Sequence, residues 1–401
     1  MSIGGNMIPL MKSTFLHEQE TKEALAKFIL RSEKLSMGDQ CEGFEAEFAT
    51  FQGSAYALLF NSGASANLAM LQSLKNLGIL VDGDKIGFSA LTWSTNVMPI
   101  FQLGLEPVPI DCDATTLNVM SLNLKDRLKE THIRALFITN ALGFAGDLAE
   151  IKQICDEENI LLIEDNCESL GTELQGKKTG NFGEMSSFSF YVAHHMSTIE
   201  GGMVCTNDEE LAEMLKIVRA NGWDRNLLSA QQYKWRKRYN IESEFEAKYA
   251  CYDLAYNFRP TEITGFLGRH QLKFLKKNIA LREQNYKLLE AAAITNPDLE
   301  TMDTSHISLL SNFAFPVFCK DKETRKKYTH RFVDTGVEIR PIIAGNIQKQ
   351  PFYNKYMYKS YSLTSTERIH KCCFYCGNYP ELTATDIQTI GSCLEEFEYD
   401  N

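Results

Sequence analysis

Apolar residues recur at helical spacing near the start of the chain and then give way to short apolar runs. The spacing predicts helices over residues 20–30 and 44–51. From about residue 56 to 206, strand-length runs alternate with helix-like stretches such as 64–77 and 148–157. The expected strands are residues 57–60, 86–89, 108–110, 135–139, 160–163, 187–190 and 203–206. Strands that alternate with helices predict a mostly parallel sheet with helices on both faces.

The pattern of apolar and polar residues changes in the second half of the chain. Asn207 as cap and Glu210 three residues later predict the start of a helix. Residues 221–256 are polar and poorly periodic, which predicts a long functional loop. A strong helical pattern covers residues 261–290. A smaller α+β unit follows, with strands at 313–318 and 337–340 and helices at 322–334 and 383–397. We place a domain boundary near residue 280, between a large domain (residues 1–280) and a small one (281–401).

Composition narrows the class of protein. The chain has 401 residues, of which 44% are hydrophobic, so it is too apolar for disorder and long enough for about two domains. Its 41 basic and 52 acidic side chains give a net charge of −11, which disfavours nucleic-acid binding. No apolar run approaches the ~20 residues that a membrane span requires. Residues 1–5 lack the charged and apolar regions of a secretory signal.

The eleven cysteines are odd in number and scattered, which is typical of reduced thiols in a cytoplasmic protein. One cluster, His370, Cys372, Cys373 and Cys376, contains a C-x-x-C pair that could bind a metal ion. A structural zinc site usually takes a second pair of ligands from elsewhere, and the sequence offers no matching pair. We therefore expect no metal there and interpret the cluster as a packed turn.

Residues 61–67 form a turn of small residues directly after an expected strand and directly before an expected helix. Uncrowded N–H groups at a helix N-terminus favour a phosphate, because the helix dipole is positive there. A second turn carries Trp93, whose ring could stack on a flat aromatic ligand. Each feature also has an ordinary interpretation, as a serine-capped helix start and as an aromatic core residue.

In two further segments, polar side chains directly follow an apolar strand. Asp165 and Glu168 follow the strand at 160–163, and in a parallel sheet they emerge at the carboxyl edge, where ligands bind. A carboxylate there can hold the protonated ring nitrogen of a pyridine cofactor, although a helix cap beside a solvated acid would look the same. The strand at 187–190 delivers Ser189 and then two adjacent histidines, His194 and His195, into a loop that ends in a Gly-Gly pair.

The order of these segments resembles the DegT/DnrJ/EryC1/StrS sugar aminotransferases over nearly the whole chain. The resemblance implies the α/β fold of aspartate aminotransferase type I, with a mostly parallel mixed sheet in a large domain and a smaller C-terminal α+β domain, and it implies pyridoxal 5'-phosphate as cofactor. In the family pattern, the lysine that carries the cofactor covalently lies seven residues before the first glycine of the Gly-Gly pair. Counting back from Gly201 gives His194, and no lysine occurs between Lys178 and Lys216.

This replacement is known from one branch of the family, the nucleotide-sugar 3-dehydratases. One subtype carries an iron–sulfur cluster with a C-x-C pair in the segment that corresponds to residues 221–256, where this chain has only Cys251. The subtype without a cluster acts on GDP-4-keto-6-deoxy-D-mannose in colitose biosynthesis, for the O-antigen of lipopolysaccharide. This chain resembles that subtype at residues 164–169, 194–195, 200–202, 221–226, 256–260 and 340–342.

The resemblance also implies roles for single residues. Asp165 would contact the pyridine nitrogen and Trp93 the ring face. The phosphate contacts would be Ala64, Ser65, Ser189 and, from the partner subunit of a homodimer, Asn257.

Three more residues face the substrate or the base in this scheme. Glu168 would polarise His194 or contact substrate, and both alternatives stay open. His195 would pack or contact substrate, although the roles of the two histidines could be reversed. Arg340 is a candidate for substrate binding. The basic run 234–238 could clamp a nucleotide diphosphate, although a solvated surface is the favoured interpretation.

Imidazole cannot form the covalent link that lysine forms, so the cofactor would be held non-covalently and would work as pyridoxamine 5'-phosphate. His194, with an ordinary pKa of about 6.5, is suited to act as the base near neutral pH. We expect loss of the C3 hydroxyl of the sugar, release of ammonia and regeneration of the cofactor by glutamate. The alternatives are a nucleotide-sugar 4-aminotransferase, a 3-dehydratase for another nucleotide-linked 4-keto sugar, and a non-enzymatic member of the family.

Overall fold

The computed structural model describes residues 7–11 and 13–397, so the segment 1–5 lies outside the described residues. Its larger sheet has seven strands in the order β1-β9-β8-β5-β4-β2-β3. Only β9 runs antiparallel to its neighbours within this sheet. The mostly parallel mixed sheet expected from the sequence is therefore confirmed. The strands are β1 (Tyr56–Phe60), β2 (Lys85–Ser89), β3 (Glu106–Ile110), β4 (Ala135–Thr139), β5 (Leu161–Asp165), β8 (Met185–Ser189) and β9 (Gly202–Thr206).

Helices cover both faces of this sheet, because its strands are apolar on both sides. On one side α3, α4 and α7 pack around Phe60 and Phe88, and on the other α5 and α6 pack around Ile110 and Ile138. The helices are α2 (Asp39–Gln52), α3 (Gly63–Asn76), α4 (Ser94–Gln102), α5 (Ser121–Leu128), α6 (Leu148–Glu157) and α7 (Glu209–Arg219), with the 3-10 turn η1 (Ala141–Gly143) after β4.

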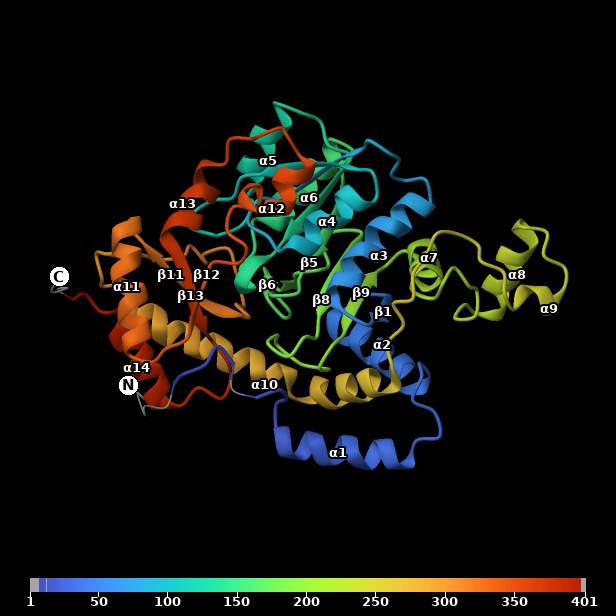
Figure 1. Cartoon of the computed structure of the whole chain (residues 1–401), viewed down its shortest axis with the longest axis horizontal. Helices are drawn as coiled ribbons and strands as arrows, with labels where there is room; N and C mark the ends of the chain where they lie inside the picture. The colour runs from blue at the N-terminus through green and yellow to red at the C-terminus, as the bar shows by residue number, and fades with distance from the viewer. Residues whose placement is uncertain (1–6, 12, 398–401) are drawn as a thin grey trace.

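A smaller antiparallel sheet lies at the other end of the molecule, with the order β10-β11-β13-β12 (Figure 1). Its strands are β10 (Leu299–Glu300), β11 (Ala314–Cys319), β12 (Ile339–Pro341) and β13 (Cys373–Gly377). The cysteine cluster is therefore not a turn: Cys373 and Cys376 belong to a buried central strand, which their apolar neighbours stabilise. The accompanying helices are α11 (Lys322–Asp334), α12 (Pro351–Tyr356), α13 (Thr364–Cys372) and α14 (Ala384–Leu394), with the short turn η2 (Ile347–Lys349).

One long helix, α10 (Glu262–Ala293), runs across the lower part of Figure 1, above α1, and packs against both α2 and α14. It continues without interruption through residue 280, so the chain has no linker at that position. The division into two domains stays a prediction. Helix α1 (Glu18–Arg31) lies beside α10, and a two-stranded ribbon, β6 (Glu173–Leu174) with β7 (Lys177–Lys178), follows β5.

Two helix boundaries, near residues 207 and 394, differ from the sequence predictions. The cap of α7 is Asp208, whose Oδ1 accepts from the Leu211 N–H at 2.9 Å, because the Asn207 side chain is already bound to the Ala55 N–H. The last helix ends at Leu394, after which the backbone becomes extended.

The segment 221–256 is not a plain loop, because it contains α8 (Ser229–Arg238) and α9 (Glu244–Ala247), which project from the body (Figure 1). In the basic run on α8, Trp235 is buried against Tyr252 and Arg236 pairs with Asp224 at 2.8 Å, so part of the run holds this projection together.

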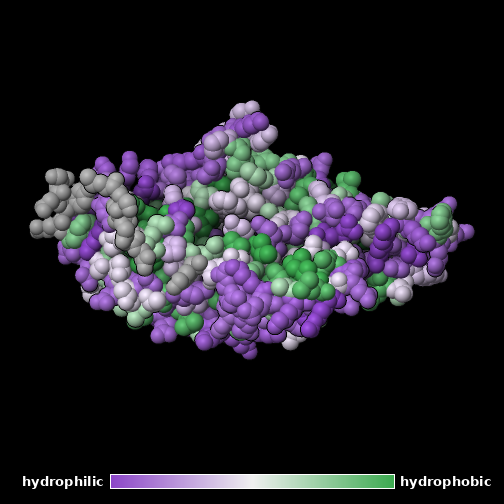
Figure 2. All heavy atoms as spheres, turned by 60° about the horizontal axis from the view of Figure 1, so that its bottom comes forward, coloured by the Kyte–Doolittle hydropathy of each residue, from purple (hydrophilic) through white to green (hydrophobic). Residues whose placement is uncertain are grey.

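Hydrophilic residues cover most of the face turned forward in Figure 2, and hydrophobic residues are exposed there in separate patches. No helix within the described chain is long and apolar enough to cross a membrane.

Candidate active site

One large cavity, of about 1120 Å³, opens between the carboxyl ends of the parallel strands and the small sheet. Seven of the residues singled out from the sequence line it, although they come from segments far apart in the chain. They are Ala64, Trp93, Asp165, Glu168, Ser189, His194 and Arg340. Three others, Ser65, His195 and Asn257, do not line it.

The turn before α3 forms one end of the cavity. Ser62 caps the helix: its Oγ accepts from the Ser65 N–H at 3.1 Å, while the Ser65 hydroxyl donates to Asn61 Oδ1 at 2.5 Å. The Ser65 hydroxyl therefore donates its hydrogen bond within the turn and not to a ligand in the cavity. Ser62 and Gly63 line the cavity in its place; both belong to the turn 61–67 predicted from the sequence, but neither was named as a phosphate contact. The serine-cap rule was the available signal for Ser62.

Close packing explains the glycines at this end. A Cβ on Gly63 would lie 2.8 Å from the Ser189 Cβ, and one on Gly202 would lie 2.3 Å from the Ser62 carbonyl oxygen. Only glycine lets β8, β9 and the turn come this close together. The result is an uncrowded helix N-terminus beside the Ser189 hydroxyl, which suits a phosphate.

Asp165 ends β5 and is only 4% exposed, yet it lines the cavity. Its Oδ2 accepts from Asn67 Nδ2 at 3.0 Å and from Asn96 Nδ2 at 2.6 Å, and its Oδ1 accepts from the Cys167 N–H at 2.8 Å. All three donors are neutral, so the charge of the carboxylate is left for a cation in the cavity. A protonated pyridine nitrogen meets that requirement.

Trp93 is the residue before α4, and 57% of its surface is exposed at the cavity wall. That exposure excludes the alternative that it is a core aromatic. Its ring is available to stack on a flat ligand held by Asp165 and the α3 turn.

His194 lies on the loop after β8, and its ring lines the cavity. Its Nδ1 lies 2.5 Å from the Cys167 carbonyl oxygen. Because a carbonyl only accepts, Nδ1 carries the hydrogen and Nε2 keeps its lone pair. Burial lowers the pKa of His194 below its ordinary value, which keeps the ring neutral and able to take a proton.

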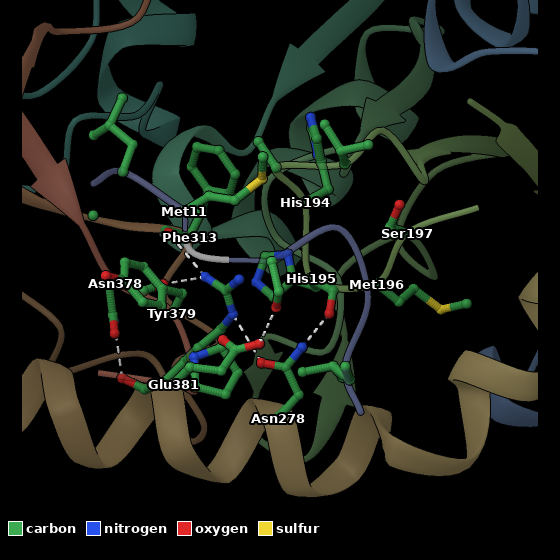
Figure 3. Close-up of a pocket in the computed structure, with 18 of the residues that line it drawn as sticks. Met11, His194, His195, Met196, Ser197, Asn278, Phe313, Asn378, Tyr379 and Glu381 are labelled. Carbon is green, nitrogen blue, oxygen red and sulfur yellow. Dashed lines mark hydrogen bonds between the residues drawn. The ribbon is translucent and has the colours of Figure 1, made fainter. Parts of the chain in front are cut away.

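His195 lies on the other side of the loop, toward Asn278 (Figure 3). Its Nε2 donates to the Ser311 carbonyl at 2.9 Å, and its own carbonyl accepts from the Asn278 amide. It lines a separate small cavity of about 90 Å³, and burial lowers its pKa well below the ordinary value. Its observed contacts therefore correspond to packing, which was one of the alternatives for this residue.

Glu168 Oε2 accepts from the Leu142 N–H at 2.9 Å. Burial, with a smaller contribution from the charge of Asp165, raises the pKa of Glu168 to about 8. The carboxyl group is therefore mainly protonated at neutral pH and can donate a hydrogen bond into the cavity.

The small sheet and its helices supply the opposite wall. Arg340 on β12 pairs with Glu338 at 2.5 Å, and the second Glu338 oxygen accepts from the Leu10 N–H at 3.0 Å. Arg325 and His370 line the same wall and were not predicted as site residues. Tertiary packing brings them together: Arg325 donates to the His370 carbonyl at 3.0 Å.

Asn257 lies away from this cavity. Its backbone bridges Ala220, and its Oδ1 accepts from Arg259 Nε at 3.0 Å. Its role toward a partner subunit stays a prediction.

The cysteines give no sign of a metal centre. All eleven carry free thiols, and burial raises the pKa of Cys373 and Cys376 well above the ordinary value. Within residues 7–11 and 13–397, no three His, Cys, Asp or Glu side chains are grouped as metal ligands.

Comparison with known proteins identifies the family of the chain. The model of the DegT/DnrJ/EryC1/StrS aminotransferase family matches residues 16–395. The chain belongs to this family. The chain is also similar to GDP-4-keto-6-deoxy-D-mannose 3-dehydratase of Yersinia pseudotuberculosis, with 32% identity over 97% of this chain and 98% of the relative.

Solved structures agree with the family assignment. GDP-4-keto-6-deoxy-D-mannose-3-dehydratase of E. coli, with bound hydrated PLP, superimposes with a TM-score of 0.89 at 32% identity, covering 97% of this chain and 100% of the other. A GDP-4-keto-6-deoxymannose-3-dehydratase with a trapped PLP-glutamate geminal diamine gives a TM-score of 0.88 at 31% identity, over 97% of this chain and 100% of the other. The predicted aminotransferase fold is confirmed.

Proposed function

We propose that this protein is a pyridoxamine-phosphate-dependent nucleotide-sugar 3-dehydratase that removes the C3 hydroxyl of GDP-4-keto-6-deoxy-D-mannose. One observation carries the proposal: the residue at the position of the family's lysine is a neutral histidine whose Nε2 lone pair is free for chemistry. The other parts of the cavity wall, which include Asp165, Trp93 and the α3 turn, suit the cofactor. A family member with this combination keeps the cofactor but cannot attach it covalently.

The cofactor contacts follow from the geometry of the cavity. Asp165 would hold the ring nitrogen, Trp93 would cover the ring, and the α3 turn with Ala64 and Ser189 would hold the phosphate. When bound, the cofactor supplies an amine for the 4-keto group and an electron-withdrawing ring. The PLP-bound relative supports this assignment, because its cofactor is present as a hydrate.

His194 is the proposed acid–base residue. Its Nε2 takes a proton from the cofactor carbon next to the ring and returns a proton to the departing C3 hydroxyl. The Nδ1–H contact with Cys167 fixes the tautomer and the ring plane during both transfers. Glu168, protonated at neutral pH, would donate a hydrogen bond beside it.

The wall of Arg340, Arg325 and His370 is the proposed location of the nucleotide part of the substrate. Guanidinium groups match phosphate oxygens in geometry and charge. His370 Nδ1 lies 3.4 Å from the Asn346 N–H, which donates to it, so its Nε2 carries the hydrogen and is a donor. The positive charge of this wall comes from the two guanidinium groups, because burial lowers the pKa of His370 and Glu338 pairs with Arg340.

Three further features belong to this proposal. The enzyme would work as a homodimer in which Asn257 reaches the cofactor phosphate of the partner subunit. It would work in the cytoplasm, since the free thiols of all eleven cysteines suit a reducing compartment. Glutamate would regenerate the amine form of the cofactor, and the relative trapped with a PLP-glutamate adduct supports this choice.

The test is to incubate the protein with GDP-4-keto-6-deoxymannose, pyridoxamine phosphate and glutamate, and to weigh the sugar product. The proposal predicts a product that has lost one oxygen and gained no nitrogen, with one ammonia released. A product that keeps nitrogen would establish the 4-aminotransferase instead. Parallel incubations with CDP- and dTDP-linked 4-keto sugars would identify a different nucleotide.

A further inference from the structure

Two asparagines beneath the cavity make an unusual contact with Asp165. Asn67 on α3 and Asn96 on α4 both donate to the same oxygen, Oδ2. Both side chains are buried, with 1% and 0% of their surface exposed. The two helices that begin at the α3 turn and at Trp93 thus also hold the carboxylate.

These contacts are costly for the fold. The amide oxygens of Asn67 and Asn96 have no hydrogen-bond partner among the described residues, although both are buried. A buried polar group without a partner is destabilising by about 1–3 kcal/mol. Apolar side chains of similar size would avoid that loss, so stability alone does not account for two asparagines here.

The geometry explains what they contribute. Neutral donors stabilise the ionised form of Asp165 without neutralising its charge, whereas a Lys or Arg would pair with the carboxylate and compete with the ring nitrogen. Two donors from different helices also fix the carboxylate in position. The Cys167 N–H fixes the other oxygen.

We propose that Asn67 and Asn96 are positioning residues that hold the Asp165 carboxylate oriented toward the cofactor ring nitrogen, and so carry part of the cofactor affinity that a covalent link supplies in other family members. This inference rests on the proposed function. It assigns to two helix residues a role in retaining an untethered cofactor.

The experiment uses Asn67→Leu and Asn96→Leu, which keep the side-chain size and remove the donor. Affinity for pyridoxamine phosphate is measured on apoprotein by fluorescence titration, with no sugar present. Each variant should weaken binding by about 10-fold, because a carboxylate that is no longer held in place must be ordered when the cofactor binds. The thermal unfolding midpoint of the apoprotein should stay the same or rise. Asn76→Leu, at the other end of α3, is the matched control and should bind normally.

A second pair of variants tests the same inference in case the leucine variants do not fold. Asn67→Asp and Asn96→Asp are isosteric, and each places a second carboxyl group against Asp165, so that the two share a proton. Cofactor affinity should then fall more steeply with decreasing pH than it does in the wild type, because the shared proton removes charge from the contact with the ring nitrogen. The neighbouring titratable groups are Glu168 and His194, and both are unchanged in the variants.

The outcomes separate this inference from the proposed function. Normal cofactor affinity in both leucine variants would overturn it, as would weaker binding that merely parallels a lower unfolding midpoint. If the variants bind weakly but the wild-type product keeps nitrogen, the positioning role stands and the dehydratase function fails.

Discussion

The two sides of the cofactor cavity are built differently. On the side of Asp165 and the α3 turn, most polar groups are held by several short hydrogen bonds from buried residues. On the side of the loop after β8, His194 has one backbone contact and a free Nε2. The first side is suited to holding a ligand rigidly and the second to moving protons. The two sides can therefore be tested separately, by affinity and by rate.

Replacing the base should give the largest effect. His194→Asn keeps a polar side chain but removes the lone pair that accepts the proton, so the rate of deoxygenation should fall about 10²- to 10⁴-fold. Affinity for pyridoxamine phosphate should change little, because the holding side is intact. Product formation is followed by mass spectrometry and affinity by fluorescence. Normal turnover in this variant would show that another residue is the base.

Asp165→Asn should affect the other side. It removes the charge that faces the ring nitrogen, so the affinity for pyridoxamine phosphate should fall by about 10- to 100-fold. Saturating cofactor should restore only part of the rate, because a neutral amide does not stabilise a protonated ring. Equal affinity in the variant and the wild type, measured by fluorescence titration, would refute the assigned contact.

The positive wall should govern substrate affinity alone. Arg325→Gln removes a charged donor from the proposed nucleotide position, so the KM for the nucleotide sugar should rise about 10-fold. Lys326→Gln is the matched control, because Lys326 is the next residue on α11 and is exposed. The half-reaction of PLP with glutamate should be the same in both variants. An unchanged KM in Arg325→Gln would place the nucleotide elsewhere.

The pH profile should show the smallest effect and should involve both sides. The rate requires neutral His194 and is lost as pH falls through its pKa, which burial lowers, so the acid limb should lie below about pH 6.5. Protonated Glu168 is lost as pH rises through its pKa of about 8, which sets the alkaline limb. Glu168→Gln should remove the alkaline limb and leave the acid limb in place. Rates measured from pH 5 to 9 in both proteins test this assignment.

Sequence reasoning succeeded where local pattern decides structure. The strands of the large sheet are buried on both faces, so they appear as continuous apolar runs. His194 was singled out by the family resemblance, in which the Gly-Gly pair marks the position of the lysine, and Gly202 lies where β9 passes close to the α3 turn. Asp165 at a strand end and Trp93 before a helix each had an ordinary interpretation until the resemblance was considered.

Sequence reasoning missed the features that depend on contacts between segments far apart in the chain. Only Trp235 of α8 is buried, so that helix carries almost no apolar periodicity. Arg325 and His370 lie on different helices, and only the fold of the small sheet brings them to the cavity. Asn67 and Asn96 appear in the sequence as ordinary polar positions within helices, because their partner, Asp165, lies far away in the chain.

The attachment of the cofactor tests the central claim most directly. The purified protein is mixed with one equivalent of PLP, reduced with borohydride, and the intact chain is weighed. The account predicts the mass of the unmodified chain for the wild type and one added pyridoxyl group for His194→Lys. A stoichiometric adduct on the wild-type chain, mapped to a residue of this cavity, would contradict it.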